Sequence, residues 1–363
     1  MSDDLFVSGA SFILDAPEGI PARWGIRDEV IWARDESLII TGPPGVGKTS
    51  LWAQIVLSMI GVNGSHVLGY PVEPASKVLY LAADRPSQIA RVFRRLVGEE
   101  HRALLDARLV ILRGPPDEDL GRHPTRLRDL ARQAQADVVI VDSLKDVTSG
   151  LTDDDIGAGI NRAFQLVLTD NIDLGISHHQ RKSGSLGSKP KNLEDVYGSA
   201  FITAGAGSVI LLWGKPGDEI ITFDHLKTPA TQVGPFTIEH DHDAGTSMVQ
   251  AGSDLLGILV LNGGCSIDQI ARLMYATDTP TPAERKRVER MLKGHEKAGR
   301  VLHVPRERQP NGTYIPAKYF LQAMDITMDK GSVADNHGQP RTGGTGKVLP
   351  FNGLTMDGTM DAP

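Results

Sequence analysis

Short apolar runs alternate with longer amphipathic stretches from residue 38 to about residue 236. Such runs, rich in Val, Ile and Leu, are typical of strands that are buried on both faces of a parallel sheet, and the stretches between them have the length of helices. The runs lie at 38–40, 77–83, 108–112, 137–142, 174–177, 208–213 and 219–223. The alternation predicts an α/β fold with a mostly parallel, twisted sheet and helices in the crossovers.

The pattern changes after His240. A polar, glycine-containing stretch follows and predicts a linker over 246–253. Three helix-length segments then precede two strand-like runs that flank a turn at 309–312, which is the order of elements in a winged helix. The predicted divisions are an N-terminal extension (1–17), the α/β domain (18–245), the linker, a winged-helix domain (254–324) and a tail (325–363) whose polar composition predicts disorder.

The composition is that of a folded protein without a membrane span. Of the 363 residues, 40% are hydrophobic and 23% are charged, which excludes a wholly disordered chain or a coiled-coil rod. No apolar run approaches the roughly 18 residues of a transmembrane helix, and the first residues lack the features of a secretion signal. The single cysteine, Cys265, excludes an internal disulfide and is expected to pack in a core.

The charge is unevenly distributed along the chain. A net charge of −7 excludes nucleic-acid binding by bulk electrostatics, so any such contact must be local. Residues 281–310 contain nine lysines and arginines against four glutamates. Within this window Arg285, Lys286 and Arg290 lie at helical spacing on the third segment of the small domain, and a winged helix would bring them to DNA. The alternative is a solvated face on a protein-interaction module.

A phosphate-binding loop stands between the first of these predicted strands and an amphipathic segment. Its glycines let backbone N–H groups close on phosphates at a helix N-terminus. Lys48 would reach the β- and γ-phosphates, and the Thr49 hydroxyl would bind Mg²⁺. The residues assigned to the nucleotide are Gly42, Pro43, Pro44, Gly45, Val46, Gly47, Lys48, Thr49 and Ser50. The pattern therefore predicts ATP and Mg²⁺ as cofactors.

Two aspartates follow predicted strands. Asp142 ends the run at 138–141, where a carboxylate would meet the phosphate loop and hold the metal. Asp84 follows the run at 77–83, where a carboxylate near the γ-phosphate would orient the attacking water. The alternatives are an ordinary strand-end aspartate at 142 and a simple ion pair of Asp84 with Arg85.

Polar residues and then a basic stretch follow the run at 174–177. Two adjacent histidines, His178 and His179, point to opposite faces of a strand, so they are not expected to share a metal. A polar group at this strand end would detect hydrolysis and move the segment behind it. The cations of that segment are Arg181, Lys182, Lys189 and Lys191.

The order of phosphate loop, strand-end carboxylates, polar sensor and basic segment resembles the RecA-like ATPases. The stretches YLAADRP, VDSLKD, SHHQRK and VYGSAFITAGAGSVILLW are most similar to the plasmid helicase RepA and the DnaB-type replicative helicases, including phage-encoded forms. The resemblance covers about residues 18–245 and does not include the winged helix.

The resemblance implies several site roles. A glutamate at the position of Asp84 is the catalytic base in this family, and the aspartate here is one methylene shorter. His179 falls on the γ-phosphate sensor position, and the basic segment resembles the DNA loop of the central channel. Lys227 matches a basic finger that enters the neighbouring subunit's nucleotide site, whereas Pro229 stands where the family has an arginine.

From this resemblance we expect an ATP-dependent DNA helicase or translocase of DNA replication. It would be a homo-oligomer, a hexameric ring with single-stranded DNA in its channel and ATP between subunits, in the cytoplasm of a bacterial host cell and without a membrane partner. Two alternatives stay open. One is a RecA/RadA-type recombination or repair ATPase, and the other is a DNA-binding ATPase that acts as a switch or loader without unwinding.

Overall fold

A computed structural model describes residues 6–180, 189–190, 192–250, 252–297, 299–309 and 313–322. Arg181, Lys182 and Lys191, the middle of the turn at 309–312 and the tail at 325–363 lie outside the described residues. No helix in the described ranges has the length and apolarity needed to span a membrane.

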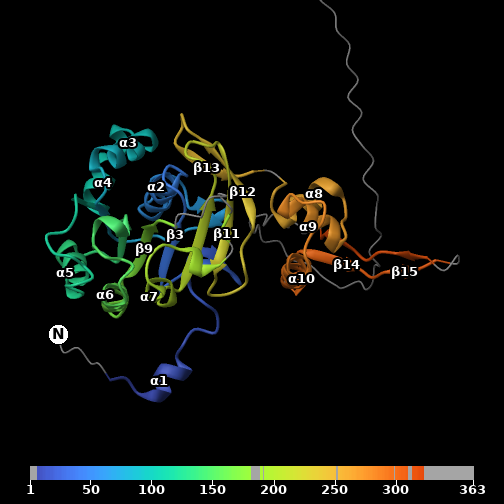
Figure 1. The fold of residues 1–363 in the computed structure, drawn as a ribbon, viewed down its shortest axis with the longest axis horizontal. Coiled ribbons are helices and arrows are strands. Elements are labelled where there is room, and N and C mark those ends of the chain that lie inside the picture. The colour runs from blue at the N-terminus through green and yellow to red at the C-terminus, as the bar shows by residue number, and fades with distance from the viewer. Residues whose placement is uncertain are drawn as a thin grey trace, which may run out of the picture. The chain divides into compact units, whose positions relative to one another are not determined.

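A nine-stranded sheet with the order β13-β12-β11-β10-β3-β9-β8-β6-β7 forms the centre of the α/β part (Figure 1). From β10 to β7 all neighbours are parallel, and β10 to β13 are antiparallel. The strands are β3 (Ser37–Thr41), β6 (Val78–Ala82), β7 (Leu109–Arg113), β8 (Val138–Asp142), β9 (Asp173–His178), β10 (Ser208–Trp213), β11 (Ile220–Lys227), β12 (Phe236–Asp241) and β13 (Thr246–Val249). The predicted α/β class with a mostly parallel sheet is confirmed.

Helices cover both faces of this sheet. They are α2 (Lys48–Met59), α3 (Pro86–Leu96), α4 (Arg102–Arg108), α5 (Thr125–Ala134), α6 (Asp154–Leu168) and α7 (Ala200–Ala204). Along β6, Tyr80 packs in the core shared with α2 and α3, and Leu79 and Leu81 pack in the core shared with α5 and α6. Side chains alternate across a strand, so a strand covered on both faces has no polar position, which explains the continuous apolar runs.

One glycine lets a helix approach the sheet closely. Trp52 of α2 is fully buried and lies against Gly175 in β9, where an added Cβ would come within 2.4 Å of the indole. The helix that follows the phosphate loop is therefore seated directly on the central strands. This packing fixes the direction in which the N-terminus of α2 points.

The sheet places the candidate site residues at one edge. β3, β6, β8 and β9 are parallel, so their carboxyl ends lie together. The phosphate loop follows β3, Asp84 follows β6, Asp142 ends β8 and His179 follows β9. Residues that are far apart in the sequence are thus gathered by topology alone.

The predicted linker is wrong at its start, because residues 246–249 form β13 and pair with β12. The turn between these strands is held by Asp241, whose carboxylate accepts hydrogen bonds from the backbone N–H groups of Asp243 and Ala244. Ser247 faces inward and is buried. A buried serine in place of an apolar residue removed the alternation that would have indicated a strand.

Further short elements, not predicted from the sequence, precede or flank the central sheet. The exposed helix α1 spans Gly9–Leu14, and β1 and β2 form an antiparallel pair around the buried Trp24 and Trp32. The strands are β1 (Ala22–Ile26), β2 (Glu29–Ala33), β4 (His66–Val67) and β5 (Tyr70–Pro71), and the 3-10 helices are η1 (Glu99–His101), η2 (Leu144–Asp146) and η3 (Leu193–Asp195).

The C-terminal part has three helices followed by antiparallel strand pairs, in the order that the sequence predicts. Its own core contains Leu259, Ile270, Val288, Leu292 and Cys265. The elements are α8 (Leu255–Asn262), α9 (Ile267–Tyr275), α10 (Pro282–Lys297), β14 (Val301–Val304), β15 (Glu307–Arg308), β16 (Tyr314–Ile315) and β17 (Lys318–Leu321), with β14 paired to β17 and β15 to β16.

Candidate nucleotide-binding site

The loop between β3 and α2 has a backbone that requires glycine. Three of its glycines have positive φ angles, which other residues rarely adopt: 155° at Gly42, 75° at Gly45 and 92° at Gly47. A Cβ at position 42 would also lie 2.3 Å from the Leu212 carbonyl oxygen. No side chain caps the N-terminus of α2, so its first N–H groups remain available to an anion.

Lys48 is buried in this loop and is held by it. Its Nζ donates hydrogen bonds to the carbonyl oxygens of Gly42 (2.9 Å) and Pro43 (2.7 Å). Burial lowers the pKa of Lys48 to about 8, although the nearby Asp142 carboxylate acts in the opposite direction. Burial disfavours the charged form of this lysine, so negatively charged phosphate groups that bind beside it would be stabilised by the ammonium.

Asp142 and Thr49 meet at the metal position that the sequence predicts. The Thr49 hydroxyl donates a 2.8 Å hydrogen bond to Asp142 Oδ2, and the Tyr80 hydroxyl donates a 2.7 Å bond to the same oxygen. A hydroxyl and a carboxylate are oxygen donors of the kind that Mg²⁺ prefers, with nucleotide phosphates and water completing its shell. Thr49 and Asp142 therefore fit a Mg²⁺ ion that is also bound by the nucleotide. Among the described residues no cluster of three or more His, Cys, Asp or Glu could hold a metal by itself.

Asp84 lies at the same edge between two cations. Its Oδ1 is 3.4 Å from Arg85 Nε and its Oδ2 is 3.6 Å from Lys145 Nζ. The ion pair with Arg85 is the alternative that the sequence left open. Lys145 also pairs with Asp146 at 2.5 Å and was not singled out by the sequence. Both cations compete with water for the carboxylate oxygens, so the role of Asp84 as catalytic base stays a prediction.

The two adjacent histidines have separate environments, as expected for a strand. His178 is fully buried, and its Nε2 lies 2.6 Å from the Tyr197 carbonyl oxygen. His179 lines the cavity at the phosphate loop. Burial, followed by the charges of Lys48 and Lys145, lowers the pKa of His179 to about 4, so its ring is neutral at pH 7. A neutral imidazole can donate a hydrogen bond to a phosphate without a change of charge.

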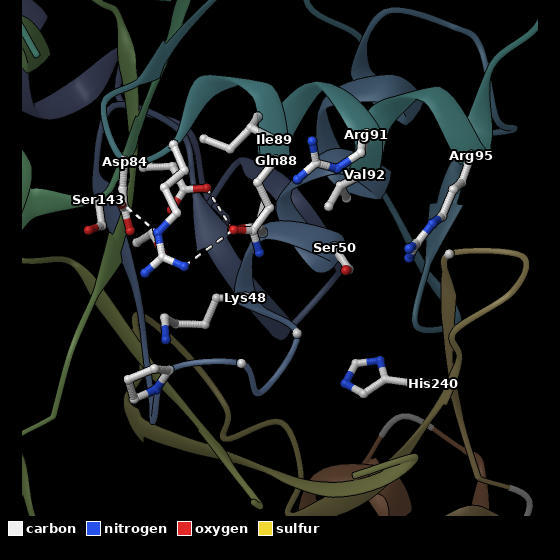
Figure 2. A pocket seen from close by; sticks show the side chains of 18 of the residues that line it. Lys48, Ser50, Asp84, Gln88, Ile89, Arg91, Val92, Arg95, Ser143 and His240 are labelled. Carbon is white, nitrogen blue, oxygen red and sulfur yellow. Dashed lines mark hydrogen bonds and ion pairs between the residues drawn. The ribbon is translucent and has the colours of Figure 1, made fainter. Parts of the chain in front are cut away.

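Most of the predicted nucleotide-site residues line one cavity of about 560 Å³ (Figure 2). They are Pro44, Gly45, Gly47, Lys48, Thr49, Ser50, Asp84, Asp142 and His179, whereas Gly42, Pro43 and Val46 do not line it. Helix α3 forms one wall, and the β12–β13 hairpin forms another through His240 and its neighbours. Arg91 and Arg95, which were not among the residues predicted for this site, extend from α3 along the cavity. The spacing of these arginines on an amphipathic helix predicts that they are exposed. It does not predict that the exposed face borders a nucleotide site.

The other predicted contact residues lie elsewhere. Lys227 does not line the cavity, and its Nζ donates hydrogen bonds to the carbonyl oxygens of Thr203 (3.3 Å) and Ala204 (2.8 Å) at the end of α7. Lys189 forms a 2.5 Å ion pair with Asp224. Arg181, Lys182 and Lys191, as noted, lie outside the described residues.

On α10 the predicted DNA-contacting residues differ in their surroundings. Lys286 and Arg290 are exposed, whereas Arg285 is half-buried and pairs with Asp268 of α9. Two of the three are therefore presented to solvent, and the third holds two helices of the small domain together.

In a comparison with protein-family models, residues 10–185 match an AAA domain. That span contains the phosphate loop, Asp84, Asp142 and His179. Residues 10–185 are therefore similar to a P-loop AAA domain. A comparison with curated proteins finds no match. The match and the site together indicate a P-loop ATPase domain, and P-loop NTPases generally bind ATP with Mg²⁺.

Proposed function

We propose that this P-loop ATPase is a DNA translocase of the RepA/DnaB helicase type that acts in DNA replication as a hexameric ring. ATP would be hydrolysed at the interfaces between subunits, and single-stranded DNA would pass through the channel.

The observation that carries the proposal is the connection between the cavity and the basic segment. His179 lines the cavity, and residue 181 begins the basic segment two positions later. The residues that flank the segment are paired with each other, because Gln180 forms a β-bridge with Val196 and the Tyr197 N–H donates a 3.2 Å hydrogen bond to the His179 carbonyl. A displacement of His179 by loss of the γ-phosphate would therefore move both flanks of the basic segment together.

The position of Lys227 is compatible with a ring. A residue that acts on the neighbouring subunit's nucleotide must lie outside its own cavity, and Lys227 does. Its hydrogen bonds to the end of α7 would be exchanged for contacts with the neighbour's phosphates. With Pro229 in the place of the family's arginine, Lys227 is the cation of this segment that we assign to that role.

The small domain supports a second DNA contact. Its helix–helix–helix–strand order is that of a winged helix, in which the third helix enters a major groove. Lys286 and Arg290 on α10 are exposed and available for this contact. Changing both to glutamate should weaken duplex binding and leave ATP hydrolysis without DNA unchanged, and an unaltered duplex affinity would identify α10 as a solvated or protein-binding face.

The proposal is tested by ATP-driven displacement of streptavidin from a biotinylated single strand. We expect displacement by the wild type, and loss of displacement in Arg181→Ala/Lys182→Ala. Each lost phosphate contact should also reduce the salt dependence of single-strand binding by about 0.7 in log–log slope. The matched control is Arg27→Ala/Arg108→Ala, which removes two exposed arginines that lie outside the basic segment.

Other outcomes would favour the other classes of protein. ATP hydrolysis that alters DNA affinity without streptavidin displacement would indicate a switch or loader. A helical filament on DNA in electron micrographs, instead of a closed ring, would indicate a recombination ATPase of RecA/RadA type.

A further inference from the structure

The β12–β13 hairpin contacts the phosphate loop through one buried imidazole. His240, near the end of β12, has 6% of its surface exposed. Its Nε2 lies 3.3 Å from the Val46 carbonyl oxygen, and its Nδ1 lies 2.7 Å from the Ser247 hydroxyl on β13. In Figure 2 the ring stands beside the loop, across from Lys48.

A chain of hydrogen bonds selects one tautomer of this histidine. Gln54 of α2 donates a 3.1 Å hydrogen bond to the Ser247 hydroxyl oxygen and accepts a 3.0 Å bond from the Ser247 N–H. The Val46 carbonyl can only accept, so Nε2 of His240 carries the ring proton and donates to it. In the neutral ring Nδ1 is then an acceptor, and the Ser247 hydroxyl, which already accepts from Gln54, donates to it. Burial lowers the pKa of His240, which favours this neutral form.

The hydrogen bond to Val46 orients the backbone of the loop. The carbonyl of Val46 and the N–H of Gly47 belong to one planar trans peptide, so they point in opposite directions and rotate together. Holding the carbonyl therefore fixes the direction of the Gly47 N–H, which is one of the loop donors that meet phosphate in this motif.

The ring and the loop are also fitted sterically. A Cβ on Gly47 would lie 2.5 Å from His240 Nε2. Gly47 is therefore required both by its φ angle of 92° and by the imidazole packed against it. The hairpin at the sheet edge and the phosphate loop form one packed unit with helix α2.

We propose that His240 is a positioning residue that holds the phosphate loop in its nucleotide-binding conformation. Through Ser247 and Gln54 it ties the loop to the β12–β13 hairpin and to α2. The inference rests on nucleotide binding at this loop and not on movement along DNA.

The effect should appear in binding and not in turnover. Loop N–H groups contact the phosphates in the ground state and in the transition state alike, so disordering one of them weakens both equally. We expect His240→Ala to raise the Kd for ADP and the KM for ATP by about tenfold, with kcat within about twofold of the wild type.

Two further variants separate the hydrogen bond from ring packing. Glutamine can place its amide N–H near the Nε2 position and keep the bond to Val46, whereas asparagine reaches only the Nδ1 position, near Ser247. We expect His240→Gln to bind ADP with nearly wild-type affinity and His240→Asn to bind as weakly as His240→Ala. Melting temperatures without nucleotide would be measured for each variant to establish that it is folded.

The test is the Kd of ADP measured by titration calorimetry in the absence of DNA. An unchanged Kd in folded His240→Ala would overturn the inference, and so would equal losses in the Gln and Asn variants. Failure of the wild type to displace streptavidin would contradict the translocase and leave this result standing. A wild type that binds no ADP would overturn the nucleotide site and this inference together.

Discussion

Nucleotide affinity should fall as the pH rises through the pKa of Lys48. In the structure this pKa is lowered to about 8, chiefly because the side chain is buried. Bound phosphates favour the charged ammonium, so the nucleotide complex has the higher pKa and binding takes up a proton at alkaline pH. The affinity is therefore full below pH 8 and declines above it. Deprotonation of Lys48 in the free protein raises the Kd by a factor of about 1.1 at pH 7 and about 11 at pH 9. Between these pH values the affinity therefore falls about tenfold, or by about 1.4 kcal/mol.

Titration calorimetry with ADP at pH 7 and pH 9 measures this change directly, and repeating the pH 9 titration in buffers of different ionisation enthalpy counts the proton taken up. The control is Lys48→Arg, because a guanidinium stays charged over this range. The variant should bind more weakly but with a nearly flat pH profile. The same affinity at both pH values in the wild type, or an equal decline in Lys48→Arg, would refute the assignment of the titrating group.

Three further predictions concern the other site residues. Asp142→Asn should reduce Mg²⁺-dependent ATP hydrolysis by about 100-fold or more while ADP still binds, because a neutral amide is a poor metal ligand; an unchanged Mg²⁺ titration of the ATPase rate would contradict this. Asp84→Asn should leave the Kd of ATP unchanged and lower kcat by about 10²-fold or more, and a full rate would mean that another group is the base. Lys227→Ala should lose ATPase activity but regain part of it when mixed with Lys48→Ala, since intact sites then form at some interfaces; no recovery in mixed rings shown to form would make Lys227 an ordinary surface lysine.

The parallel core could be predicted because its physical signals are local. Strands covered on both faces give continuous apolar runs, and the phosphate loop needs glycines and a lysine at fixed spacing. Since parallel strands end at one edge, the order of strand-end residues was enough to expect Asp142 and His179 near Lys48. The structure places all three around one cavity.

The edge hairpin could not be predicted in the same way. β13 buries Ser247, which is bonded to Gln54, distant in the sequence, and to His240 on the paired strand. A polar residue therefore stands at an inward position, the apolar alternation is lost and the segment looks like a linker. His240 contacts the loop only because β12 is placed beside β11 at the sheet edge. Lys145 pairs with Asp84 through the approach of two strand ends, which no spacing in the sequence encodes.

Strand displacement on forked DNA with ATP is the most direct test of the central claim that this P-loop ATPase moves along DNA. The assay compares the wild type with Lys48→Ala under identical conditions, with mass photometry to count subunits. We predict ATP-dependent release of the strand by a ring-sized wild-type assembly and no release by Lys48→Ala. Vigorous DNA-stimulated ATP hydrolysis by the wild type with no strand released would contradict the claim.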